Sequence, residues 1–252
     1  MHLAATQLAR GDLRQGKRPS EQVGAAHWAP TCFRIWPPFA AEPSYVAVRL
    51  SADRARALAE LLQVLSCGED SAALTFDHLG RSCQERSLRS ALSGIAADER
   101  EHQILLAGLS AALPQANKDP SLEATMRRFF MRLADRDVHI HCVRIVAIDS
   151  AVCQILGALR RRGTPINADL RVRSILKRIH QDEARHVAIA SRCAMPLLNS
   201  ARGRDIAADA RDRLTQVLGL RASSLESLSV DPDRLFARLR ALPWLARRSG
   251  AP

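Results

Sequence analysis

Two stretches of this chain nearly repeat each other, ADEREHQ at residues 97–103 and QDEARHV at residues 181–187. Each contains Asp-Glu-x-x-His, and each stands inside a long segment whose apolar residues recur every three to four positions, the period of an α-helix. With ten glutamates and eight histidines in 252 residues, chance produces roughly 0.02 such motifs. Two copies therefore indicate a shared role, and their apolar flanks argue against a merely solvated charge pattern.

The spacing within each motif is typical of a helix that binds a metal. Residues i and i+3 lie on one helix face, so Glu99 and His102 present a carboxylate and an imidazole to one point, as do Glu183 and His186. Oxygen and imidazole donors together suit iron, manganese or zinc. In four-helix bundles, di-iron and di-manganese sites combine two Glu-x-x-His helices with one carboxylate from each of two other helices. The chain should therefore supply two further acids.

A helical pattern extends over most of the chain. Only 4% of the residues are aromatic, while Ala, Leu and Arg are abundant, which favours helices over strands. Whether residues 121–161 form one helix or two broken near Asp135 stays open. We expect helices over residues 51–80, 84–113, 121–161, 167–198, 203–219 and 231–248.

These helices predict an all-α fold in three parts. Residues 51–198 would form a four-helix bundle, and residues 199–252 would add two accessory C-terminal helices packed on it. Residues 1–50 begin without periodicity and contain Pro37-Pro38, which the interior of a helix does not accommodate. We expect an irregular N-terminal extension there.

The turn at residues 162–168 gives the first of the missing acids. Antiparallel neighbours bring together residues that are roughly equidistant from the turn that joins them. Glu183 follows this turn and Asp149 precedes it at nearly the same separation along the chain. Asp149 is also the one acid in the apolar run RIVAIDSAVCQIL.

The turn at residues 80–85 gives the second acid by the same comparison. Glu99 follows this turn and Glu69 precedes it at similar separations, whereas Glu60 stands much farther back and fits worse. The two halves of the chain then form a pseudo-repeat of helix pairs. The predicted metal ligands are Glu69, Glu99, His102, Asp149, Glu183 and His186.

Other residues are expected to support the ligands. Asp98 and Asp182 precede the two ligand glutamates and could accept a hydrogen bond from a ligand imidazole, including that of the opposite helix. Arg185 stands beside His186, and His180, one helical turn before Glu183, is a candidate additional ligand or hydrogen-bond partner. The residues expected to line a cavity beside the metals are Cys153, Phe76 and Leu106.

A further pair of histidines is expected to have a structural role. His139 and His141 are two residues apart, so on a helix they face about 200° apart and cannot both bind one ion. We expect at least one of them in the core.

The order of these residues resembles the ferritin-like superfamily of di-iron carboxylate proteins: a carboxylate, about thirty residues, Glu-x-x-His, then a second carboxylate and a second Glu-x-x-His. The run DEARH at residues 182–186 is similar to the oxygen-activating branch, which includes monooxygenase hydroxylases, acyl-carrier-protein desaturases, N-oxygenases and ribonucleotide reductase small subunits. The resemblance covers about residues 51–198. Two departures are Asp149, where a glutamate is usual, and the absence of a tyrosine from the bundle.

The resemblance implies two iron ions, with manganese as the alternative, and an enzyme that uses O2 to hydroxylate, desaturate or N-oxygenate an organic substrate. The chain shows no flavin or iron–sulfur motif, so a reductase or ferredoxin would supply electrons. The net charge of +11 suits an acidic carrier protein that presents the substrate, and nucleic acid suits it less well. The alternatives are a tRNA-modifying di-iron hydroxylase, a non-catalytic iron-binding or redox-stress protein, and an inactive site kept as a scaffold.

Cysteines and hydropathy bear on localisation. The six cysteines include no C-x-x-C pair, which favours free thiols in a reducing compartment. No uncharged apolar run reaches about 18 residues, and no hydrophobic signal segment is apparent. We therefore expect a cytoplasmic protein without a membrane span, for which a homodimer is one possible state.

Overall fold

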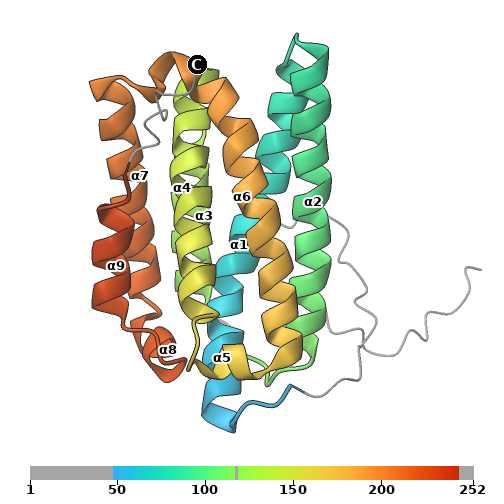
Figure 1. The fold of residues 1–252 in the computed structure, drawn as a ribbon, viewed down its shortest axis with the longest axis vertical. Coiled ribbons are helices and arrows are strands. Elements are labelled where there is room, and N and C mark those ends of the chain that lie inside the picture. The colour runs from blue at the N-terminus through green and yellow to red at the C-terminus, as the bar shows by residue number, and fades with distance from the viewer. Residues whose placement is uncertain (1–47, 117–118, 244–252) are drawn as a thin grey trace, which may run out of the picture.

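The computed structural model describes residues 48–116 and 119–243, and within these ranges the protein is all-helical, as predicted, with no strand (Figure 1). Four long helices run side by side along the longest axis: α1 (Ala52–Ser82), α2 (Arg86–Ala111), α4 (Val138–Leu159) and α6 (Leu170–Leu198). Shorter helices connect or flank them: α3 (Pro120–Leu133), α5 (Pro165–Ala168), α7 (Ala201–Gly219), α8 (Ala222–Ser227) and α9 (Pro232–Arg240).

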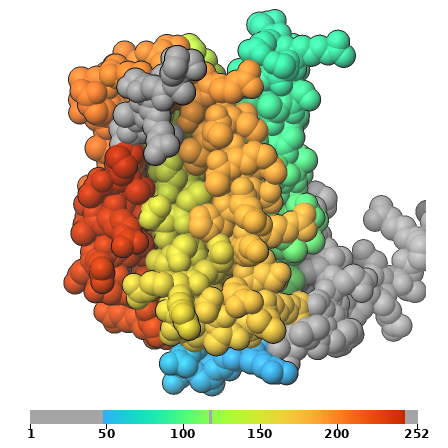
Figure 2. All heavy atoms as spheres, viewed as in Figure 1, coloured from blue at the N-terminus to red at the C-terminus, as the bar shows by residue number. Residues whose placement is uncertain are grey.

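The long helices pack as two antiparallel pairs. The first pair is α1 with α2, the second is α4 with α6, and α2 also packs against α6. The accessory helices α7 and α9 cover α4, while α3 contacts α1 and α7. In the space-filling view, α4 reaches the surface in a strip between α9 and α6 (Figure 2). This arrangement places the two Asp-Glu-x-x-His helices, α2 and α6, against each other.

Aspartates begin the helices that follow the breaks in the chain. The Asp137 side chain accepts hydrogen bonds from two backbone N–H groups of the first turn of α4, and Asp169 does the same for α6. Residues 134–137 separate α3 from α4, with Ala134 in an extended conformation. The segment 121–161 is therefore two helices broken near Asp135.

The C-terminal helices differ from the prediction. The predicted helix over residues 231–248 ends at Arg240, because Pro243 cannot donate a hydrogen bond and its ring would clash with the carbonyl four residues earlier. Its last residues, 244–248, lie outside the described ranges. The six-residue helix α8 was not predicted, because so short a segment shows no periodicity.

The helix α4 forms the centre of the core. Most of its residues are buried, including Val143, Ala147 and Ala151, which are fully buried. Among the described residues it is also the one helix long and apolar enough to cross a membrane by length and composition. Because 61% of its most apolar window is buried inside the protein, it has the character of a core helix.

Two expectations have a limited or negative outcome. The predicted irregular extension over residues 1–50 lies almost wholly outside the described ranges. Its last three residues, 48–50, are described and are non-helical. Four of the described cysteines are free, but Cys67 is disulfide-bonded, so the expectation of free thiols is wrong for this residue.

Candidate metal centre

Three helices bring four of the predicted ligands into one buried group. Glu69 comes from α1, Glu99 and His102 come from α2, and Glu183 comes from α6. One ligand atom from each lies within 4.8 Å of all the others, and none of the four residues is more than 5% exposed. Such a group of carboxylates with an imidazole could hold a metal ion.

The carboxylates surround the inward-facing nitrogen of His102. Its Nδ1 lies 3.1 Å from Glu69 Oε2 and 3.2 Å from Glu99 Oε2. The Oε1 atom of Glu183 lies 3.7 Å from the same nitrogen. One imidazole and three helices thus converge on one point.

A second convergence of the same kind surrounds His186. Its Nδ1 lies 3.0 Å from Glu99 Oε1 and 4.0 Å from Glu183 Oε2. Asp149, from α4, is 7% exposed and interacts electrostatically with Glu99 and His186. Among the described residues, no hydrogen-bond partner is found for Asp149 Oδ2, and His186 Nδ1 has only the ion-pair contact with Glu99 and Glu183. Two buried polar atoms are therefore left facing the site, as ligands of an ion would be.

Glu99 and Glu183 each reach both histidines. Each uses one carboxylate oxygen toward His102 and the other toward His186. Glu69 lies on the His102 side. The site therefore consists of two adjacent imidazole positions that share two carboxylates.

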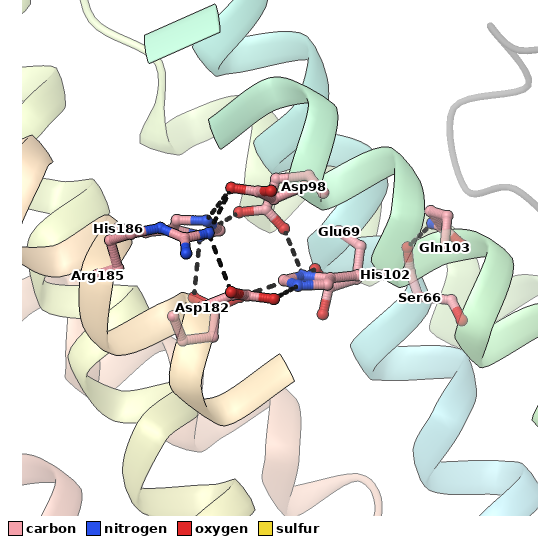
Figure 3. Close-up of polar contacts among 10 residues, drawn as sticks. Ser66, Glu69, Asp98, His102, Gln103, Asp182, Arg185 and His186 are labelled. Atoms are coloured by element: carbon pink, nitrogen blue, oxygen red, sulfur yellow. Dashed lines mark hydrogen bonds and ion pairs between the residues drawn. The ribbon is translucent and has the colours of Figure 1, made fainter. Parts of the chain in front are cut away.

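The outer nitrogens of the two imidazoles are held by the aspartates of the opposite motif (Figure 3). His102 Nε2 lies 3.3 Å from Asp182 Oδ2, and His186 Nε2 lies 3.1 Å from Asp98 Oδ2. Arg185 Nη2 joins the two aspartates, at 2.7 Å from Asp98 and 2.9 Å from Asp182. If Nε2 carries the hydrogen and donates it to the aspartate, the lone pair of Nδ1 is directed into the site.

Burial and mutual repulsion perturb the titration of the group. Burial and the nearby Glu99 raise the pKa of Glu69 and of Glu183, and they raise the pKa of Asp149 to about 8. Burial lowers the pKa of His102, but hydrogen bonds to Glu69 and Glu99 outweigh it and raise that pKa to about 11. Four buried acids face two imidazoles, so the site carries more potential negative charge than its histidines can neutralise. This donor set fits cations.

An apolar cavity adjoins the carboxylates. The centres of water-sized molecules could occupy about 70 Å³ of it, and it is walled by α1, α3, α4 and α7. Its lining includes the predicted residue Phe76, together with the ligand candidates Glu69, Glu99, Asp149 and Glu183.

Two predicted cavity residues do not line it. Leu106 is fully buried in the core, away from the cavity wall. Cys153 interacts electrostatically with Asp149 and Glu183 and so lies near the site, but it is not part of the wall. The wall follows the side of α4 that faces α1, α3 and α7.

Two other candidates are directed elsewhere. His180 Nδ1 accepts a hydrogen bond from Arg160 Nη1 at 2.6 Å, so the guanidinium at the end of α4 holds this imidazole. Glu60 accepts a hydrogen bond from Ser224 Oγ at 2.7 Å and thus links α1 to α8. The preference for Glu69 over Glu60 agrees with this placement.

The sequence did not single out His141 for the site. His139 is structural, as its Nδ1 lies 2.7 Å from the carbonyl oxygen of Cys193. His141 instead lines the cavity. The signal that could have found it is the helical register, since His141, Ile145, Ile148 and Val152 share one face of α4.

Comparisons of the chain with protein-family models, curated proteins and solved structures find no significant match. The functional assignment therefore has to come from the site itself.

Proposed function

We propose that this chain is a ferritin-like four-helix-bundle protein that binds two iron ions, with manganese as the alternative, and uses O2 to oxidise an organic substrate. The observation that carries the proposal is the sharing of Glu99 and Glu183 between His102 and His186. One ion would need a single imidazole position, whereas two positions with common carboxylates suit a pair of ions.

The residues divide naturally between the two ions. Glu69 and His102 would hold one, Asp149 and His186 would hold the other, and both ions would share the remaining pair of glutamates. Bound ferrous iron would supply electrons for the reduction of O2. Asp98 and Asp182 would keep the imidazoles in position, because they contact the outer nitrogens, and Arg185 holds the two aspartates.

The cavity supports an oxidase or oxygenase over an iron store. Its wall is mostly aliphatic and aromatic, and it reaches four of the ligand carboxylates. An apolar enclosure of this kind binds an organic molecule and excludes bulk water from the reacting groups. A protein that only stores or binds iron does not need such a cavity.

External electrons are needed for repeated turnover, so a reductase or ferredoxin is the partner we propose. The acidic carrier protein suggested by the net charge stays a prediction, as does the less favoured tRNA substrate. Retention of the protein on an immobilised carrier protein or on tRNA would separate these two partners.

The reaction with oxygen tests the proposal. Protein loaded anaerobically with Fe(II) should consume O2 faster than the same iron in buffer, and the Glu99→Gln variant should lose this acceleration. After repeated additions of Fe(II) and O2, the iron content should stay near two per chain. O2 uptake no faster than in buffer, or growth of a ferric mineral far beyond two ions per chain, would contradict an oxygenase.

A further inference from the structure

His141 is a buried polar side chain on the wall of an otherwise apolar region of the cavity. It is 5% exposed, and its neighbours on the same face of α4 are Ile145, Ile148 and Val152. Among the described residues no hydrogen bond of its imidazole is found, and its ring nitrogens are not fully enclosed, so they remain accessible from the cavity that the residue lines. A buried polar group normally has a hydrogen-bond partner, so a bound molecule is the natural candidate to provide it.

The charge of the cavity indicates what kind of molecule it accepts. Burial, with the cation of Arg144 nearby, lowers the pKa of His141 to about 4, so the imidazole is uncharged near neutral pH. Arg144 itself pairs with Asp135 at 3.1 Å and is not part of the wall. The cavity wall has no Lys or Arg, and its charged groups are the ligand carboxylates. A neutral molecule with a hydrogen-bonding group fits this wall, whereas an anion does not.

The register of α4 sets the distance between His141 and the candidate ions. His141 precedes Asp149 by eight residues, which is about 12 Å along the helix axis. An extended chain advances about 1.2 Å per bond, so about ten bonds span this distance. The wall continues to Ile155, six residues and about 9 Å beyond Asp149. A molecule that is held at His141 and is longer than about ten bonds therefore passes the carboxylates with its interior, whereas one of about ten bonds ends beside them.

The helix opposite contributes a second polar group at the same end of the cavity. Thr75 of α1 lines the cavity six residues after Glu69, and the nearby His78 interacts electrostatically with His141. The helices α1 and α4 run antiparallel (Figure 1). Thr75 follows Glu69 on α1 and His141 precedes Asp149 on α4, so both lie on the side of the carboxylates nearer the start of α4. The cavity thus has two uncharged polar groups, His141 and Thr75, at one end, some distance from the carboxylates.

We propose that the cavity binds a neutral amphiphile, such as an alcohol, amide or ketone with a hydrocarbon chain, and that His141 binds its polar group. His141 then determines which carbon lies beside the ligand carboxylates, about ten bonds from the polar group. The part of this inference that concerns the reaction beside the carboxylates rests on the proposed function. The binding of the amphiphile does not.

Binding is testable on the full chain without metal. Calorimetric titration should show that 1-decanol binds and that decanoate, with the same chain length, binds at least tenfold more weakly. The His141→Phe variant, which keeps an aromatic ring but loses the hydrogen bond, should bind 1-decanol roughly tenfold more weakly. His141→Gln should restore part of the affinity, because its amide can hydrogen-bond.

The matched control is His78→Asn, which changes an exposed histidine on α1 outside the cavity wall and should leave the affinity unchanged. Circular dichroism establishes that each variant is folded. Equal binding of 1-decanol and decanoate, absence of 1-decanol binding to the folded protein, or wild-type affinity in folded His141→Phe and His141→Gln variants would overturn the proposal. Because no metal is present, these failures are distinguishable from a failure of the proposed iron chemistry.

Discussion

His102 on α2 and Asp182 on α6 are joined at 3.3 Å between the imidazole Nε2 and the carboxylate, although 80 residues separate them. The reciprocal contact joins His186 to Asp98 at 3.1 Å. Each Asp-Glu-x-x-His motif therefore supplies a histidine of the candidate site and the acid that contacts the histidine of the other motif. The repeat in the sequence is explained by this mutual support, which neither copy could provide alone.

Removal of one orienting acid should weaken metal binding without removing a ligand. In Asp182→Ala, His102 loses the partner of its outer nitrogen, so we expect a 10- to 100-fold loss of Fe(II) affinity. Competition with a chelator under anaerobic conditions measures it. The control Asp77→Asn changes a half-buried acid that pairs with Arg100 and Arg81, away from the imidazoles, and should bind as the wild type does. Unchanged affinity in Asp182→Ala would show that the contact has no part in metal binding.

Loss of a shared carboxylate should cost more metal than loss of an unshared one. Glu99 faces both histidines, whereas Glu69 faces His102. We expect Glu99→Gln to retain almost no iron after anaerobic gel filtration, and Glu69→Gln to retain about one ion per chain. Equal losses in the two variants would contradict the sharing.

Replacement of Asp149 should stabilise the metal-free protein. This carboxylate is 7% exposed, and its Oδ2 atom has no hydrogen-bond partner among the described residues. Burial and Glu99 raise the pKa of Asp149 to about 8, so near neutral pH this residue must take up a proton on folding. Asp149→Asn keeps the shape and needs no proton to be neutral, so the free energy of unfolding in urea should rise by about 1–2 kcal/mol. The same variant should bind less iron. Glu123→Gln, at a partly exposed pair with Arg127, serves as the control and should change stability little. A less stable Asp149→Asn apoprotein would count against the account.

His141 should make the protein sensitive to mild acid. Burial and the charges of Arg144 and His78 outweigh Asp135 and lower its pKa from 6.5 to about 4 in the folded state. The unfolded chain therefore binds this proton first, and stability is lost as the pH falls from about 6.5 to about 4. Between pH 7 and 4.5 the loss from this residue should be roughly 2–3 kcal/mol. Urea titrations at both pH values should show a smaller loss in His141→Gln than in the wild type. An equal loss in both proteins would mean that His141 does not titrate in this way.

The sequence predicts the position of a site residue when helix register determines it, and not when contacts with other helices determine it. Glu69 and Asp149 were found by counting from turns, because antiparallel helices keep a fixed register over three or four turns. The hydrogen-bond partner of His180 could not be identified in this way. Its spacing from Glu183 carries no information about Arg160, which holds its imidazole from another helix. The cavity wall was also out of reach, because α3 and α7 contribute to it and their placement depends on tertiary packing.

In the fold, too, most features with a local sequence pattern were predicted and features without one were not. The apolar period of a long helix is a local feature, so α1, α2, α4 and α6 could be placed within a few residues. The six-residue α8 could not, since so short a segment lacks a measurable period, and the end of α9 at Arg240 was missed although Pro243 marks it.

The number of iron ions per chain tests the central claim most directly. Anaerobic titration of the metal-free protein with Fe(II), followed by removal of unbound metal, should give two ions per chain in the wild type. The Asp77→Asn control should give the same value, and Glu183→Ala, which removes a shared carboxylate, should give close to none. Fewer than about one ion per chain in the wild type, or undiminished binding in Glu183→Ala, would contradict a site built from two motifs that share their carboxylates.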